Sequence, residues 1–211
     1  MRTVVIGSGS WGTALAQVLQ DNHQEVLVYG VAEAEVNDIN ENHKNSKYFE
    51  DVELNPELKA TTDIQCVKGA DIVLLAVPTI AIDPICHQIN DILDKKTIII
   101  NVSKGFHPET NERMSEVIRR CIDEDKLSSV VSLIGPSHAE EVVIRLLTTI
   151  DAISLNNEDA VTVQNLFSNQ YLRIYTGNDS LWCSFWWATK NIHGSNWNWR
   201  LDCNLYECTF S

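Results

Sequence analysis

The opening stretch of the chain, Arg2 to Ala16 (RTVVIGSGSWGTALA), constrains the fold more than any other part of the sequence. Residues 2–6 are a short run rich in β-branched side chains, which favours a strand. Three glycines follow in the pattern G-x-G-x-x-G, and apolar residues at helical spacing come directly after them. A strand that turns through glycines into a helix predicts a βα unit whose turn holds the diphosphate of a dinucleotide.

Each glycine of this turn has a separate physical role. Gly7 permits the tight turn out of the strand, Gly9 leaves the backbone bare for a pyrophosphate, and Gly12 allows the helix to pack closely on the strand. The helix start adds free N–H groups and a partial positive charge. The alternative is a glycine-rich turn without a ligand. The flanking strand and helix, and a second apolar strand at 25–29, favour the nucleotide site.

The rest of the chain alternates between segments typical of strands and segments of helical length. Strands separated by helices form βαβ units, so the sequence predicts an α/β fold with a doubly wound, Rossmann-type parallel sheet. Ligands bind such sheets beyond the carboxyl ends of the strands. The expected strands are 2–6, 25–29, 58–62, 71–77, 97–102, 130–134, 148–155 and 171–175. The expected helices are 11–21, 32–43, 80–93, 109–123, one that begins near 137, and 157–167.

Two further strand ends carry candidate chemistry. Lys104 follows the buried strand at 97–102, where its ammonium can hold a phosphate or a carbonyl oxygen; a surface lysine in a turn is the alternative. Ser137 and Glu140 fit the capping box S-x-x-E at the start of a helix. His138 is a weaker candidate for a general acid or base, because its intrinsic pKa lies near neutrality.

Composition narrows the classes of partner and compartment. The net charge of −13 argues against nucleic acid, so an anionic ligand must be held by local donors. No apolar run approaches the ~18 residues of a membrane span. A strand at residues 1–6 leaves no room for a signal peptide, and the six cysteines have no metal-type spacing. We therefore expect a cytoplasmic protein with free thiols and no metal site.

The sequence leaves the choice between NAD and NADP open. An acid at the tip of the second strand favours NAD, and a nearby arginine favours NADP. The segment here is Tyr29-Gly30-Val31-Ala32-Glu33, in which the acid comes late and arginine is missing.

Four motifs together resemble the bacterial NAD(P)-dependent glycerol-3-phosphate dehydrogenases, in order and in interval. They are GSGSWGTALA, VPT, NVSKG and IGPSHAEEV. The resemblance extends from residue 1 to about 179 and implies an NAD(P)-binding domain over residues 1–178. It also implies hydride transfer between NAD(P)(H) and the pair dihydroxyacetone phosphate and sn-glycerol 3-phosphate, in glycerophospholipid synthesis. In the full-length family it implies a homodimer.

The resemblance also implies roles for particular residues. Lys190 aligns with the catalytic lysine that exchanges a proton with the substrate oxygen, and Lys104 contacts both cofactor and substrate. Gly135 and Ser137 line the substrate site. The implied cofactor contacts are Gly7, Gly9, Ser10, Trp11, Gly12, Lys104 and Ala139. Position 31, often basic or polar in the family, is Val31 here, which leaves the contact to the ribose 2′ position open.

Residues 179–211 depart from the family, which continues into an all-helical substrate domain. Five of the six tryptophans lie between 182 and 199, and three of them replace family glycines, at 182, 186 and 187. A one-base slip converts glycine codons to the tryptophan codon, so we expect a partly frame-shifted tail that ends at a premature stop. That tail would keep only a short remnant of the helical domain.

We therefore expect Lys190 to be misplaced in space and the chain to be impaired in catalysis. Two alternatives stay open: a non-catalytic dinucleotide-binding module, and an interaction protein that uses the Trp-rich tail.

Overall fold

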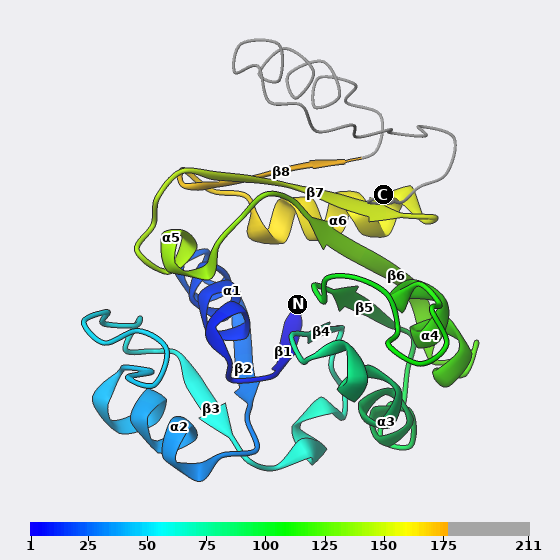
Figure 1. The fold of residues 1–211 in the computed structure, drawn as a ribbon, viewed down its shortest axis with the longest axis horizontal. Helices are drawn as coiled ribbons and strands as arrows, with labels where there is room; N and C mark the ends of the chain where they lie inside the picture. The colour runs from blue at the N-terminus through cyan, green and yellow to red at the C-terminus, as the bar shows by residue number, and fades with distance from the viewer. Residues whose placement is uncertain (177–211) are drawn as a thin grey trace.

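One sheet of eight strands, in the order β3-β2-β1-β4-β5-β6-β7-β8, organises residues 1–176, the part of the chain described by this computed structural model (Figure 1). The strands β1 to β6 are mutually parallel in the doubly wound order 3-2-1-4-5-6, which confirms the predicted fold class. The strands are β1 Arg2–Ile6, β2 Glu25–Tyr29, β3 Lys59–Thr61, β4 Ile72–Leu75, β5 Thr97–Asn101, β6 Leu127–Ile134, β7 Thr148–Ser154 and β8 Leu172–Thr176.

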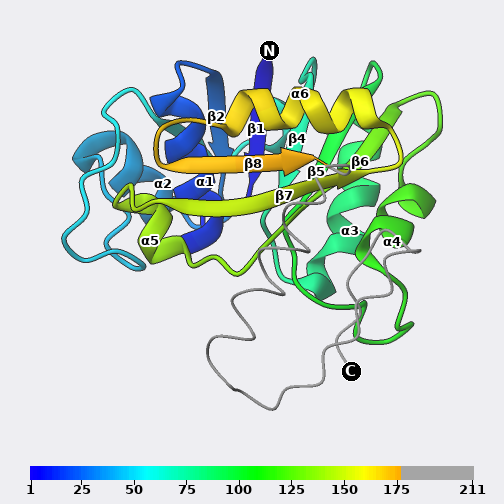
Figure 2. The same ribbon diagram turned by 90° about the horizontal axis from the view of Figure 1, so that it is seen from above.

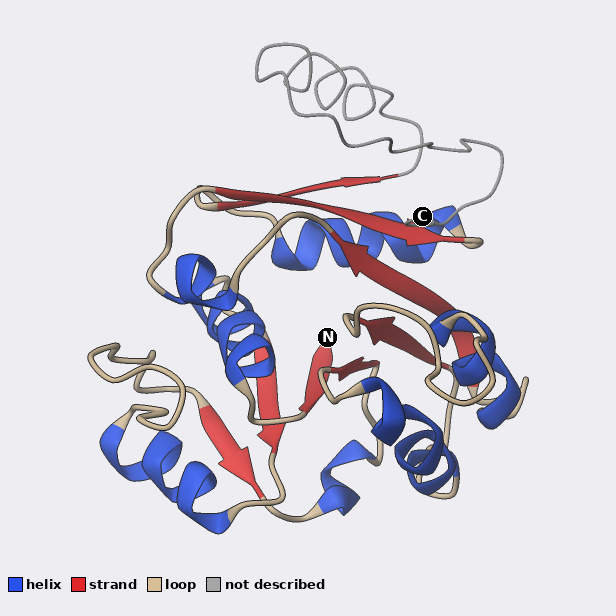
Figure 3. Cartoon of the chain, viewed as in Figure 1, coloured by secondary structure: helices blue, strands red, loops and turns tan. Residues whose placement is uncertain are grey.

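Helices cover both faces of this sheet (Figures 2 and 3). The helix α1 packs with α5 and α6 on one face, and α3 packs with α4 on the other. They are α1 Ser10–Asp21, α2 Glu33–Asn37, α3 Thr79–Asn90, α4 Met114–Cys121, α5 Ala139–Val143 and α6 Asn157–Phe167, with a π-helical turn at Asp38–Asn42 and a 3-10 turn at Ile64–Val67. Within residues 1–176, every helix is too short or too polar to cross a membrane.

The central strands are apolar throughout because both faces of each strand are covered. In β4, Ile72 and Leu74 join the core on the α1 side, while Val73 and Leu75 join the core on the α3 side. All four side chains are fully buried. The same burial on both faces explains why the run at 71–77 was recognisable as a parallel strand from sequence.

The strand β7 departs from the all-parallel sheet expected from sequence. It pairs antiparallel with β6, with Ile134 opposite Asp151, and β8 then pairs parallel with β7. A parallel neighbour needs a crossover that returns along the sheet. The connection at 135–147 contains only the short α5, which packs on α1 instead of along β6.

The helix α4 is shorter than the predicted 109–123. Residues before it form a loop in which the His107 amide donates to the Glu112 carbonyl oxygen at 2.9 Å. The His107 Nδ1 atom accepts from the Thr110 amide at 3.2 Å. These bonds hold the backbone in a turn, so the helix begins only at Met114.

Candidate active site

The order in which successive strands join the sheet reverses between β1 and β4. From β1 the chain continues outward to β2, and it later returns to place β4 on the other side of β1. The turns that follow β1 and β4 therefore diverge and leave a crevice at the carboxyl edge, where open α/β sheets bind their ligands.

The glycine turn after β1 shows why this chain needs glycine there. Gly7 has a φ of 118°, and a Cβ atom on it would lie 2.5 Å from the Ala76 carbonyl oxygen. A Cβ atom on Gly12 would overlap the Gly7 carbonyl oxygen, so α1 starts tightly against the turn. A Cβ atom on Gly9 would meet nothing within 4 Å. Gly7 and Gly12 are thus required by the protein's own packing, whereas Gly9 borders open space.

The first turn of α1 offers backbone donors toward that space. Gly9 occupies the N-cap position with a φ of −69°, and no side chain caps the helix. The leading amides of a helix have no partner within the helix, and they carry the positive end of its dipole. An anion such as a diphosphate would supply the missing acceptors.

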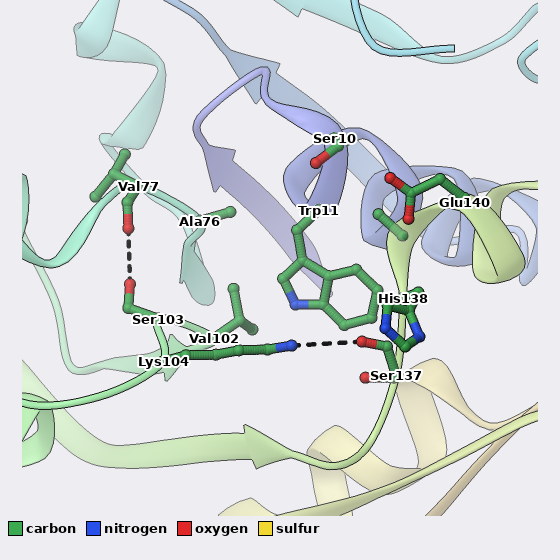
Figure 4. Close-up of a pocket in the computed structure, with 11 residues that line it drawn as sticks. Ser10, Trp11, Ala76, Val77, Val102, Ser103, Lys104, Ser137, His138 and Glu140 are labelled. Atoms are coloured by element: carbon green, nitrogen blue, oxygen red, sulfur yellow. Dashed lines mark hydrogen bonds between the residues drawn. The ribbon is translucent and has the colours of Figure 1, made fainter.

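A cavity of about 330 Å³ opens beside this turn and collects residues from four strand ends (Figure 4). A second cavity of about 250 Å³ shares Trp11, Lys104 and Ser137 with the first and adds Gly135. The first cavity is lined by Ser10, Trp11, Ala76, Val77, Val102, Ser103, Lys104, Ser137, His138, Ala139 and Glu140.

Lys104 reaches across the first cavity from the end of β5. Its Nζ donates to the Ser137 carbonyl oxygen at 3.4 Å, a long contact for an ammonium group with three donors (Figure 4). Gly105, with a φ of 93°, allows the chain to turn directly after the lysine. The neighbouring Ser103 hydroxyl donates to the Val77 carbonyl oxygen at 2.7 Å and ties the β5 loop to the β4 loop.

Ser137 does not form the predicted capping box. The helix α5 begins at Ala139, its N-cap is His138, and no side chain caps it. The Ser137 amide instead bonds back to the Gly135 carbonyl oxygen at 3.0 Å, so the chain makes a tight turn before the helix. Ser137 is consequently only 5% exposed and contributes to the cavity wall.

His138 lines the cavity, but its ring lies 3.7 Å from the Glu141 carboxylate, measured between Nδ1 and Oε2. The side chain is 73% exposed. This geometry gives His138 a partner on α5 and places it at the cavity mouth.

Sequence reasoning missed a cluster behind the glycine turn. Glu35, 8% exposed, accepts hydrogen bonds from the Ser8 hydroxyl and from Lys47 Nζ, the latter at 2.6 Å. Asn45 donates to the Ser8 carbonyl oxygen at 2.7 Å and to the Thr13 hydroxyl at 2.9 Å. These side chains fix the backbone of the turn. The only signal in the sequence was the serine inside the glycine pattern.

Comparison with known proteins gives the family. The sequence profile described as NAD-dependent glycerol-3-phosphate dehydrogenase N-terminus matches residues 2–161. The chain belongs to this family. A glycerol-3-phosphate dehydrogenase [NAD(P)+] of Listeria innocua is 45% identical over 192 residues, which are 90% of this chain and 57% of that protein. A relative with the same description from Streptococcus sanguinis is 44% identical and is covered to 56%.

Solved structures agree with this membership. The crystal structure of glycerol-3-phosphate dehydrogenase from Coxiella burnetii superposes with a TM-score of 0.77 at 26% identity, over 84% of this chain and 54% of that one. GDP-mannose dehydrogenase from Pseudomonas aeruginosa shares the fold alone, with a TM-score of 0.65 at 16% identity. The chain spans between one half and three fifths of the length of these three glycerol-3-phosphate dehydrogenases.

The residues that the family resemblance implies converge on one edge of the sheet. Gly7, Gly9 and Gly12 form the turn after β1. Five others line the first cavity, and Gly135 lines the second; the five are Ser10, Trp11, Lys104, Ser137 and Ala139. A Cβ atom on Gly135 would lie 2.8 Å from Ile150 Cγ2, so β7 leaves room only for glycine there. Lys190 lies outside the described residues.

Proposed function

We propose that this chain binds NAD or NADP at the glycine turn and serves, as its family does, in the interconversion of dihydroxyacetone phosphate and sn-glycerol 3-phosphate. The observation that carries the proposal is the meeting of that turn with Lys104 and Ser137 around one cavity. The family membership supplies the reaction class. The reaction belongs to glycerophospholipid synthesis, and we propose the cytoplasm as its compartment and a homodimer as the assembly.

The residues present fit a dinucleotide. The uncapped start of α1 offers amides to a diphosphate, and the open space at Gly9 lets the diphosphate approach. The nicotinamide, when bound, supplies or accepts the hydride. The Lys104 ammonium supplies a positive charge inside the cavity of an otherwise acidic molecule, where it attracts a phosphate or polarises a carbonyl oxygen.

Two parts of the proposal concern residues beyond the described ones. We propose that Lys190, which aligns with the family's proton-exchanging lysine, is misplaced in this chain, which therefore turns over little or no substrate, and that residues 179–211 follow the domain at 1–178 as a partly out-of-frame segment. The tryptophans at family glycine positions support the second part. The coding DNA tests it directly: the idea fails if no one-base change restores a glycine-containing continuation.

Cofactor binding is tested by titrating the full chain with NADH and with NADPH and following nucleotide fluorescence. We expect saturable binding of at least one of them, and the comparison decides between the two cofactors. Lys104→Met should weaken that binding about three- to tenfold, because it removes a charge from the cavity wall. Lys96→Met removes an equal charge from an exposed lysine at the opposite end of β5 and should change nothing.

Three results of the titrations and of a dihydroxyacetone phosphate reduction assay would contradict or change the proposal. A flat response to both nucleotides would contradict the proposed site. Equal losses in the Lys104 and Lys96 variants would show that only net charge matters. Binding without any reduction of dihydroxyacetone phosphate, even after the reading frame is restored, would favour a non-catalytic dinucleotide-binding module.

A further inference from the structure

A second group of reactive side chains lies on the opposite face of the sheet from α1, between α3 and α4. The two helices lie side by side in both views (Figures 1 and 2). Asp83 and His87 are one turn apart on α3, and Cys121 is the last residue of α4. One ligand atom from each side chain, an oxygen, a nitrogen and a sulfur, lies within 4.8 Å of the other two. None of the three lines the cavities of the candidate active site.

The distances suit a small tetrahedral cation. Cys121 Sγ lies 3.3 Å from Asp83 Oδ1, and His87 Nε2 lies 3.2 Å from the same oxygen. In a zinc site, bond lengths of about 2.0–2.3 Å place neighbouring ligand atoms about 3.3–3.6 Å apart. Two of the three spacings are therefore close to those of a bound ion. The third, between Cys121 and His87, is at most 4.8 Å, and the His87 side chain is exposed enough to rotate when an ion binds.

The surroundings hold the carboxylate in place. Arg120 Nη2 lies 3.2 Å from the other carboxylate oxygen, Asp83 Oδ2, and 3.2 Å from Glu112 Oε2. This contact orients Asp83 and leaves Oδ1 facing Cys121 and His87, as outer-shell partners do at metal sites. Glu112 offsets the positive charge of Arg120, which would otherwise oppose a cation.

The site is closed on one side and open on the other. Cys121 is 4% exposed, whereas the His87 side chain is 63% exposed. A cation can thus enter past the imidazole, and solvent can supply a fourth ligand. In the structure the Cys121 thiol donates a hydrogen bond to Asp83 Oδ1, so its proton lies between the sulfur and the oxygen. A cation would occupy the position of that proton, which leaves to solvent as the thiol becomes a thiolate ligand.

We propose that Asp83, His87 and Cys121 bind a divalent cation of zinc-like chemistry and thereby link α3 to α4. Sulfur, imidazole nitrogen and carboxylate oxygen together select zinc over calcium or magnesium, which take oxygen ligands. Cysteine spacing could not predict this site, because Cys121 is far in sequence from its partners and shares no motif with them.

The test uses the full reduced chain with Zn²⁺, measured by competition with a chromophoric chelator, and with Co²⁺ as a spectroscopic probe. We expect one Zn²⁺ bound and a thiolate-to-cobalt charge-transfer band. His87→Ala, Asp83→Asn and Cys121→Ser should each weaken Zn²⁺ binding at least about tenfold, and the Cys121 variant should lose the band. Added Zn²⁺ should raise the Tm of the native chain but not that of His87→Ala.

The matched control is Cys66→Ser, which alters another free thiol but leaves the three ligands intact. It should bind Zn²⁺ and Co²⁺ as the native chain does, with Cys183, Cys203 and Cys208 present in every protein compared. Failure of the native chain to bind Zn²⁺, full binding by His87→Ala, or equal losses in the Cys66 and Cys121 variants would overturn the proposal. The exposed position of His87 keeps the test decisive even if a variant at buried Cys121 unfolds.

Discussion

Gly9 and Gly12 stand three residues apart in one turn, yet the protein uses them for different purposes. Gly12 faces the Gly7 carbonyl oxygen and has no room for a methyl group, whereas Gly9 faces open space and has a φ that alanine adopts readily. One glycine therefore serves the fold, and the other serves the space in which we propose a diphosphate.

This contrast gives a matched pair of substitutions. Gly12→Ala should lower the free energy of unfolding by about 2–3 kcal/mol, because backbone must move to admit the methyl group. Gly9→Ala should stay within about 0.5 kcal/mol of the native chain but bind NADH or NADPH at least about tenfold more weakly. Urea unfolding and nucleotide fluorescence measure the two effects. A Gly9 variant that binds as tightly as the native chain would contradict the proposed approach of the diphosphate.

Asp151, in β7 opposite Ile134, carries a charge that the fold disfavours. Burial raises the pKa of its carboxyl from 3.8 to about 6. The folded state therefore holds a proton that the unfolded state releases, so this contribution to stability is complete below pH 4 and is lost as the pH rises through 6.

Asp151→Asn should remove this loss. At pH 7.5 we expect the variant to be about 1 kcal/mol more stable than the native chain, a value discounted for the partial exposure of the side chain. As the pH rises from 4 to 6, the free energy of unfolding of the variant should also decline less than that of the native chain. Urea unfolding across pH measures both effects, with Glu124→Gln at an exposed site as the charge-matched control. Parallel pH profiles for Asp151→Asn and the native chain would refute this account.

At the scale of elements, α6 begins with a side-chain cap at its N-terminus. The Asn156 side chain accepts hydrogen bonds from the amides of Glu158 at 3.0 Å and Asp159 at 3.4 Å. Two leading amides of the helix thus have an acceptor, unlike those of α1 and α5, which lack side-chain caps. The capped helix supports the sheet, whereas α1 and α5 begin beside the candidate active site.

Asn156→Ala should lower the free energy of unfolding by about 1 kcal/mol, because it leaves these amides without their acceptor. Asn157→Ala, one residue later at an exposed position, should change stability by only a few tenths of a kcal/mol. Chemical unfolding of the two variants makes the comparison. Equal effects at both positions would show that the cap contributes nothing.

At the scale of the whole molecule, the candidate site exists only because the sheet brings distant segments to one edge. Turns after β1, β4, β5 and β6 meet around the cavity, although Ser10 and Ala139 are more than half the described chain apart. The same folding brings Asp83 and Cys121 together between α3 and α4, on one face of the sheet. One sheet thus assembles one set of reactive side chains at its carboxyl edge and another set on one of its faces.

The sequence alone determined the βα unit with its glycine turn, the alternation of strands and helices, and the family. These follow from local chemistry: β-branched runs, φ angles open only to glycine, and motifs at strand ends. The prediction of α6 at 157–167 was correct to the residue, because its N-cap and its apolar spacing are both local.

Only the tertiary structure decided which segments meet. The antiparallel pairing of β7 with β6 and the bond between Ser8 and buried Glu35 depend on partners distant in the chain. A residue's local pattern states what it prefers in isolation. The free energy gained from burial and long-range hydrogen bonds is large enough to override that local preference. These interactions form only once the sheet has assembled.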